Sequence, residues 1–184
     1  MTTATRFTSE SRRDKAMSIL LEEAELFYEA SLDELAKARS EADAQKRSVL
    51  VRDAAEKAWN ASVKAVEALL TAYGYDPEDI KTYKMKRDKL EELESKNPQV
   101  RDMNLSDRFA AREQKLHIRC LYDGDCTAEW LEEELKKVKR LIDDVYSLLA
   151  SQAAPDSTNA TLPEPQHPSP LSTGKVPEPR GLGA

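Results

Sequence analysis

Apolar side chains recur every three or four residues along most of this chain, a spacing that places them on one face of an α-helix. The pattern predicts a first helix from about Ser11 to Ala42 and a second from about Ala44 to Tyr73. The second helix is followed by Gly74, a residue type that favours the left-handed conformation of helix ends, and then by Pro77. The first half of the chain is therefore predicted to consist of two long amphipathic helices.

The predicted second helix carries a row of mostly small side chains at helical spacing: Ala54, Ala58, Ala61, Ala65 and Leu69. A row of small side chains allows a neighbouring helix to approach closely. Trp59 lies beside this row, and a large aromatic residue at helical spacing is expected to pack in the core.

Three more helices are predicted in the second half of the chain. The third runs from about Pro77 to Ser95, a polar loop leads to Asn104, and Ser106 is placed to cap the fourth helix. Thr127 is placed to cap the last helix. The apolar residues of the last helix recur in steps of four and three, as in a heptad repeat: Leu131, Leu135, Val138, Ile142, Val145 and Leu149. This seam can serve the core of the bundle, a dimer interface, or both.

The composition changes abruptly after Leu149. Seven of the nine prolines lie in residues 151–184, among serine, threonine and glycine, and such a segment cannot form a hydrophobic core. Residues 151–184 are therefore predicted to be a disordered tail, and residues 1–9 a disordered N-terminus. Residues 10–150 are predicted to form one all-α domain, an antiparallel up-and-down bundle of about five helices around one core.

The charge of the chain is unevenly distributed. The net charge of −6 argues against a protein whose whole surface is basic and binds nucleic acid, although it allows a local basic patch. Residues 81–119 hold eleven basic and seven acidic side chains, an excess of four positive charges. This middle third is the predicted anion-facing surface, and a solvated helix surface is the alternative explanation for most of its charges.

The two cysteines, Cys120 and Cys126, flank a predicted turn. A single pair in a helical chain whose start does not resemble a secretory signal indicates reduced thiols and a cytoplasmic location, and a disulfide that tightens the turn is the alternative. No apolar run approaches the ~20 residues of a membrane span, so no membrane association is expected.

The stretch SDRFAAREQKLHIRCLYDG, residues 106–124, gathers the candidate chemistry. Arg108, Arg112, Lys115 and Arg119 are spaced by four, three and four residues, so they form one basic stripe along a helix. His117 lies at the border between this solvated side and an apolar side, where the pKa of an imidazole can be tuned. A histidine in such a place is either an acid/base group or simply a packing residue.

Two stretches of the chain resemble a known family. The run RDAAEKAWNASVKAVEALL, residues 52–70, is similar to the signature helix of the HEPN superfamily of helical-bundle proteins, closest to its PaREP-like prokaryotic, largely archaeal branch, which shows an AxEKxW-like run there. The run LHIRCLYDGDCTAEWLEEELKKVKRLIDDV, residues 116–145, resembles the same branch in its Leu-His, aromatic, Asp-Gly and long amphipathic helix. The resemblance spans residues 11–150 and implies a helical bundle that forms a homodimer.

The resemblance also implies an activity. Many HEPN proteins are metal-independent RNA endonucleases marked by an arginine, four to six residues, and a histidine, and Arg112 and His117 match that spacing. A histidine of near-neutral pKa can activate a ribose 2′-hydroxyl or protonate the leaving oxygen, and an arginine can hold the scissile phosphate. Arg108, Lys115 and Arg119 are then candidates for nucleic-acid binding. On a straight α-helix five residues turn the chain by about 500°, so the side chains of Arg112 and His117 point about 140° apart. Because one chain then cannot bring them together, a composite site across a symmetric dimer is expected.

Departures from the family pattern favour a second hypothesis. Glu113 follows the arginine where active members carry a small polar residue, and Arg119 stands where related toxins often have a tyrosine, with Tyr122 three residues later. The alternative to a nuclease is therefore a binding or regulatory module without catalysis, acting on itself, on a partner protein or on nucleic acid. For the nuclease, the resemblance implies RNA as substrate and a cognate protein partner such as a nucleotidyltransferase antitoxin.

Metal chemistry is not predicted. Asp123, Asp125, Thr127 and Glu134 occupy positions one, three, five and twelve of a calcium-binding loop, but Ala128 stands at position six, where the turn requires glycine. The sequence also lacks a glycine-rich phosphate loop, so no metal and no cofactor is expected.

Overall fold

The computed structural model describes the backbone of residues 3–153 and the side chains of residues 11–152. All regular secondary structure in that range is helical, and the helices pack around one hydrophobic core. The predicted all-α antiparallel bundle is therefore confirmed. Most of the predicted tail, from residue 154 onward, lies outside the described residues.

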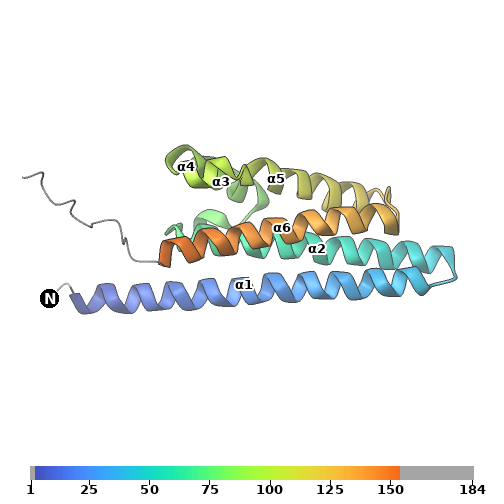
Figure 1. Ribbon diagram of the computed structural model, residues 1–184, viewed down its shortest axis with the longest axis horizontal. Coiled ribbons are helices and arrows are strands. Elements are labelled where there is room, and N and C mark those ends of the chain that lie inside the picture. Colours follow the sequence, from blue (N-terminus) through green and yellow to red (C-terminus); the bar gives the residue numbers. More distant parts are fainter. Residues whose placement is uncertain (1–2, 154–184) are drawn as a thin grey trace, which may run out of the picture. The chain divides into compact units, whose positions relative to one another are not determined.

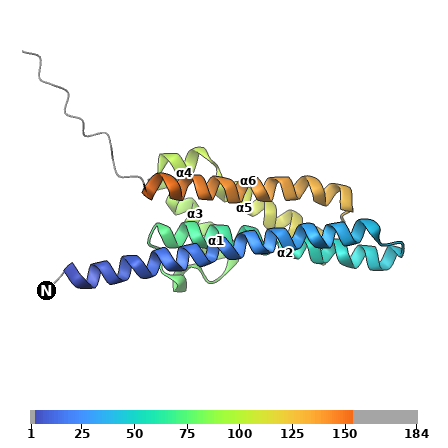
Figure 2. The same cartoon turned by 60° about the horizontal axis from the view of Figure 1, so that its bottom comes forward.

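The helices follow one another in the order α1 (Thr3–Ser40), α2 (Ala44–Ala72), the 3₁₀-helix η1 (Pro77–Ile80), α3 (Tyr83–Lys96), α4 (Pro98–Asp102), α5 (Leu105–Arg112), the π-helix η2 (Glu113–Tyr122) and α6 (Ala128–Ala153). Figure 1 shows α1 and α5 running in one direction, with α2 and α6 running in the other. The short helices α3 and α4 lie near one end of the bundle in both views (Figures 1 and 2). Helix α2 contacts α1, α3, α5, η2 and α6, so it forms the centre of the fold.

Helices α1 and α2 form a long antiparallel hairpin. Helix α1 begins at Thr3, earlier than the predicted start near Ser11. The hydroxyl of Ser31 donates a hydrogen bond to the carbonyl oxygen of Tyr28 at 2.6 Å, so this buried serine is satisfied inside an unbroken helix. Asp43 caps α2, because its carboxylate accepts a hydrogen bond from the backbone N–H of Lys46.

The predicted core row of α2 is confirmed, since Ala54, Ala58, Ala61, Ala65 and Leu69 are all fully buried. Trp59 is also fully buried, and its ring stacks on that of Phe109 with centroids 4.9 Å apart. Gly74 ends the helix with φ of +85°, the left-handed conformation expected at this position.

The third predicted helix is interrupted, and the polar loop after it is partly helical. The interruption follows Ile80, because the side chain of Thr82 accepts a hydrogen bond from the N–H of Met85 and starts α3 there. Helix α4 begins at Pro98, with Asn97 as its cap, and buries Val100. A polar loop was predicted here, but the Asn-Pro pair begins a helix, since proline suits the first position of a helix.

The prediction that Ser106 caps the fourth helix is wrong. Helix α5 begins two residues earlier, at Leu105, with Asn104 in the cap position. The backbone N–H and hydroxyl of Ser106 both donate to the carboxylate of Glu94 on α3, at 2.8 and 2.5 Å. A carboxylate from another helix therefore accepts the hydrogen bonds of this helix N-terminus. The fourth helix is also not α-helical throughout, because it continues from Glu113 as the π-helix η2.

Helix α6 completes the core. Every residue of its predicted apolar seam is buried within the chain, and Thr127 caps the helix by accepting from the N–H of Trp130 at 3.3 Å. The seam therefore serves the core of the bundle. Along residues 3–153, no helix combines the length and the apolar character that crossing a membrane requires.

Candidate functional site

His117 lies on η2 in a cluster of aromatic rings. Its ring centroid is 4.9 Å from that of Tyr122, 5.5 Å from that of Tyr83 and 5.9 Å from that of Trp59. Its side chain is 12% exposed, and its Nδ1 lies 3.4 Å from Oε2 of Glu56 on α2. The structure thus places an imidazole between aromatic faces and beside a carboxylate.

Three polar atoms of this cluster are buried without a hydrogen-bond partner among the described residues: Oε2 of Glu56, Nε1 of Trp59 and Nδ1 of His117. The contact between Glu56 and His117 is therefore a close approach that lacks the alignment of a hydrogen bond. It becomes an ion pair only when the imidazole is protonated.

Arg112 faces a different part of the bundle. Its Nη1 lies 2.6 Å from Oε2 of Glu134 on α6, and the two side chains are only 6% and 3% exposed. Lys137 and Lys115 approach the other oxygen of Glu134, at 2.6 and 3.2 Å. One buried carboxylate is therefore surrounded by three cationic side chains.

The environment shifts the pKa values of both partners. Burial raises the pKa of the Glu134 carboxyl, but the hydrogen bond from Lys137, the charge of Arg112 and the contact with Lys115 outweigh it, so the pKa is lowered. Burial lowers the pKa of the Arg112 guanidinium, and the nearby charge of Glu134 opposes this effect only in part. Both groups are ionised at neutral pH, and the pair is a structural link between α5 and α6.

The two residues of the Arg–His motif are not brought together within one chain. Arg112 contacts Glu134 on α6, whereas His117 contacts Glu56 and Trp59 on α2. The side chains of Arg112 and His117 therefore point to different sides, as their spacing predicts, although His117 lies on a π-helix and not on the predicted α-helix. π-Helical segments are rare and are frequent at functional sites.

The outer residues of the basic stripe also face acids of the same chain. Arg108 pairs with Asp144 at 2.7 Å and donates to the carbonyl oxygen of Met103. Arg119 pairs with Asp125 at 2.7 Å, and its guanidinium lies 5.2 Å from the ring centroid of Trp130. These pairs reduce the positive field that the sequence pattern predicts for this stripe.

Glu113, which departs from the family pattern, is paired with Arg87 on α3. Its charge is thus partly neutralised inside the chain. Glu113 and Arg112 are adjacent in sequence but are engaged by different helices, α3 and α6.

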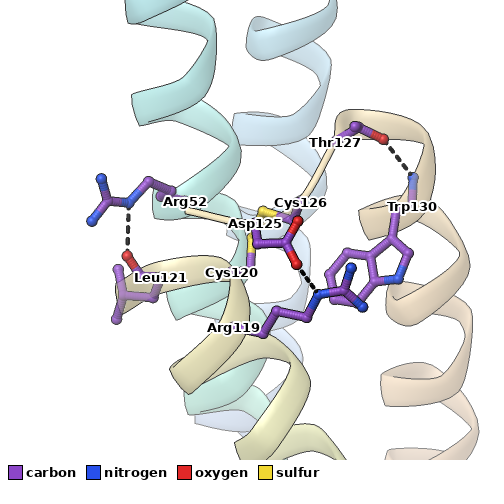
Figure 3. Close-up of a disulfide and its surroundings, with 8 residues drawn as sticks. All are labelled: Arg52, Arg119, Cys120, Leu121, Asp125, Cys126, Thr127 and Trp130. Atoms are coloured by element: carbon purple, nitrogen blue, oxygen red, sulfur yellow. Dashed lines mark hydrogen bonds and ion pairs between the residues drawn. A yellow bond between two sulfur atoms is a disulfide. The ribbon is translucent and has the colours of Figure 1, made fainter. Parts of the chain in front are cut away.

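A disulfide joins Cys120, at the end of η2, to Cys126, just before α6. The prediction of reduced thiols is therefore corrected by the structure. Figure 3 shows the bond together with Arg52 of α2, whose Nε donates to the carbonyl oxygen of Leu121 at 2.7 Å. The disulfide closes the turn, and Arg52 attaches the same turn to α2.

Sequence reasoning missed the partners of the two motif residues. Glu56 belongs to the AxEKxW-like run, but nothing in that run indicates that its carboxylate approaches His117. In the sequence, Glu134 stands out only as position twelve of an incomplete calcium-binding loop. Within residues 11–152, no group of three or more histidine, cysteine, aspartate or glutamate side chains is arranged to hold a metal ion.

Comparisons with known proteins assign no family to this chain. No protein-family model matches it, and no curated protein or solved structure matches it either. The HEPN resemblance therefore stays a prediction that rests on residues 52–70 and 116–145.

Proposed function

We propose that this chain is a HEPN-like helical module, of the PaREP-like kind, that acts as a homodimer by binding a partner and not by catalysis. The observation that supports this proposal is the burial of Arg112 against Glu134. An arginine that stabilises a scissile phosphate has to present its guanidinium to the substrate. In this chain the guanidinium is already engaged by a carboxylate and is nearly inaccessible.

The free energy needed to separate Arg112 from Glu134 also argues against catalysis. If the guanidinium turned toward a substrate, the buried carboxylate of Glu134 would lose its closest arginine contact. Separating one partner from a buried ion pair typically costs about 3–5 kcal/mol. Lys115 and Lys137 would offset part of that cost, because both already approach Glu134.

The partner class under this proposal is a second copy of the chain, together with a protein or a nucleic acid. The apolar seam of α6 is buried in the core, so self-association would use another surface. Light scattering on the purified chain tests the proposed dimer directly. A dimer mass at micromolar concentration is expected, and a monomer mass would contradict it.

A metal-independent RNA endonuclease is the second candidate, and one observation favours it. Glu56 lies beside Nδ1 of His117, and a carboxylate in that position can orient an imidazole and stabilise its charged form during acid/base catalysis. The active site would then combine Arg112 of one chain with His117 of another, with Arg108, Lys115 and Arg119 along the RNA. A nucleotidyltransferase antitoxin would be the cognate partner.

RNA cleavage in EDTA separates the two candidates. The assay compares the wild type with His117→Gln and with a matched control, His167→Gln, which changes the only other histidine of the chain. No cleavage by any of the three proteins is expected for the binding module. Cleavage that is lost in a folded His117→Gln protein but kept in His167→Gln would overturn the proposal and establish the nuclease.

A cytoplasmic location is part of the same proposal, and the disulfide provides its test. Cytosolic reductants keep most protein thiols reduced, so a cytoplasmic location implies that the disulfide between Cys120 and Cys126 is open inside the cell and closes only under oxidising conditions. Trapping of thiols in intact cells, followed by mass spectrometry, measures their state. A fully oxidised pair would contradict a cytoplasmic location.

A further inference from the structure

The disulfide closes a loop that also carries one ring of the aromatic cluster around His117. Cys120 lies near the end of η2 and Cys126 lies two residues before the start of α6, with a sequence separation of 6 between them. Tyr122 lies between the two cysteines, and its ring centroid is 4.9 Å from that of His117. A bond that fixes this loop therefore also restrains the ring that packs on the imidazole.

Tyr122 is the most exposed of the three rings that surround His117. Trp59 on α2 is fully buried and Tyr83 on α3 is partly buried, so both rings belong to the packed bundle. Tyr122 is 64% exposed, whereas the side chain of His117 is only 12% exposed. Loss of the contact with Tyr122 would therefore uncover an imidazole that the folded chain keeps nearly buried.

The other interactions of the loop restrain Tyr122 weakly (Figure 3). Arg52 donates to the carbonyl oxygen of Leu121, which holds the backbone beside Tyr122 but not its ring. The side chains of Arg119 and Asp125 pair at 2.7 Å, but they are 45% and 69% exposed, and an exposed ion pair contributes little to stability. Tyr122 is the last residue of η2, and helix ends fray. The covalent bond is therefore the main restraint on this end of the helix.

The two sulfur atoms differ in access to a reductant. Cys120 is fully buried and Cys126 is partly exposed, so the thiolate of an external dithiol attacks Sγ of Cys126. A mixed disulfide forms there, the bond between the cysteines breaks, and Sγ of Cys120 leaves as a thiolate. The second thiolate of the reductant then displaces Sγ of Cys126. The dithiol is oxidised to a cyclic disulfide, and its two protons end on the two cysteines.

We propose that the disulfide between Cys120 and Cys126 is a redox switch that controls access to His117. With the bond closed, Tyr122 packs on His117 and shields it. With the bond open, the end of η2 loosens, Tyr122 leaves the imidazole, and His117 becomes accessible together with the neighbouring carboxylate of Glu56. The inference goes beyond the proposed function and does not depend on the HEPN resemblance, because it follows from the positions of one disulfide and one tyrosine.

The test measures how fast diethyl pyrocarbonate modifies the imidazole of His117, as read by mass spectrometry of peptides. The oxidised wild type is compared with the wild type reduced by dithiothreitol, which is removed under nitrogen before the reagent is added. His167, the only other histidine of the chain, gives a reference rate in each sample. Cys126→Ser provides a chain that cannot form the bond, and circular dichroism measures the helicity of every sample.

Reduction is expected to raise the rate at His117, relative to His167, about fivefold, because local opening of the loop exposes the imidazole. Reoxidation with oxidised glutathione should restore the slow rate. Cys126→Ser is expected to react at the fast rate with or without dithiothreitol. Equal rates in the oxidised and the reduced wild type would overturn the proposal. A faster reaction accompanied by loss of helicity would also overturn it, because reduction would then unfold the chain and not only the loop.

Two substitutions test whether Tyr122 is the shield. Tyr122→Ala keeps both cysteines but removes the ring, and Tyr122→Phe is the matched control that keeps a ring. Oxidised Tyr122→Ala is expected to react at the fast rate without a further rise on reduction, whereas Tyr122→Phe should respond as the wild type does. A wild-type response in Tyr122→Ala would overturn the proposal. The dimer mass and the RNA cleavage are measured separately, so failure here leaves the proposed function standing.

Discussion

Arg112 and Glu134 form a buried ion pair between α5 and α6, with Nη1 of the arginine 2.6 Å from Oε2 of the glutamate. The arginine that the motif predicts as a phosphate clamp is thus also a structural residue. Any loss of function in an Arg112 variant has two explanations, one chemical and one structural. Measurements on Glu134 separate them, because that residue is outside the Arg–His motif.

Replacing Glu134 with glutamine is expected to destabilise the chain by about 3 kcal/mol, since it leaves the buried charge of Arg112 uncompensated. Urea unfolding followed by circular dichroism measures this change. Glu133→Gln is the matched control: it alters an exposed neighbour on α6 and should stay within about 0.5 kcal/mol of the wild type. Similar stability for the two variants would show that the pair does not stabilise the fold.

Stability is expected to fall as the pH decreases below about 4.5, the ordinary pKa of a glutamate carboxyl. Burial raises the pKa of Glu134, but the hydrogen bonds and charges around it lower the pKa below the ordinary value. A carboxyl whose pKa is lower in the folded state stabilises the fold above the unfolded pKa, and this contribution is lost as the pH falls through the folded pKa. The free energy of unfolding, measured in urea between pH 7 and pH 3, should therefore depend less on pH in Glu134→Gln than in the wild type. The same pH dependence in both proteins would show that Glu134 does not have a lowered pKa in the folded chain.

The disulfide between Cys120 and Cys126 is expected to stabilise the chain by roughly 2 kcal/mol, the value for a short closed loop. Cys126→Ser, which changes the less buried of the two residues, should lower the melting temperature by a matching amount. Dithiothreitol should lower the melting temperature of the wild type but not of Cys126→Ser. An equal response of both proteins would mean that the reductant acts elsewhere.

Glu94→Ala is expected to destabilise the chain by about 2 kcal/mol, because the N–H and hydroxyl of Ser106 both lose a charged acceptor at the start of α5. Differential scanning calorimetry measures the shift in melting temperature. The control is Glu91→Ala, an exposed position on the same helix that is expected to leave the melting temperature nearly unchanged. If Glu94→Ala behaves like this control, α5 does not depend on that cap.

The sequence was sufficient for the parts of the fold that depend on periodicity. The alanine row of α2 and the seam of α6 each repeat at a helical interval, so their burial follows from the pattern alone. Gly74 and Thr127 were also predictable, because their roles depend on their own residue type and immediate neighbours.

Features that depend on contacts between distant segments were not predictable. Glu94 serves the N-terminus of α5 only because α3 packs beside it, and Glu134 meets Arg112 only because α5 and α6 adopt one particular register. The spacing of Arg112 and His117 indicated a candidate motif but not the helix that each side chain faces. The transition to a π-helix at Glu113 has no counterpart in the apolar pattern, and we have no physical account of it.

The stacking of Trp59 on Phe109 has a consequence for biosynthesis. A ribosome produces the α1–α2 hairpin first, and Trp59 then lacks the rings that pack on it in the folded chain until α3, α5 and η2 have supplied Tyr83, Phe109 and His117. Apolar surface that is transiently exposed on an incomplete chain promotes aggregation and chaperone binding. Translation of residues 73–122 is therefore the interval in which this part of the nascent chain is most exposed, and the release of η2 from the ribosome ends it.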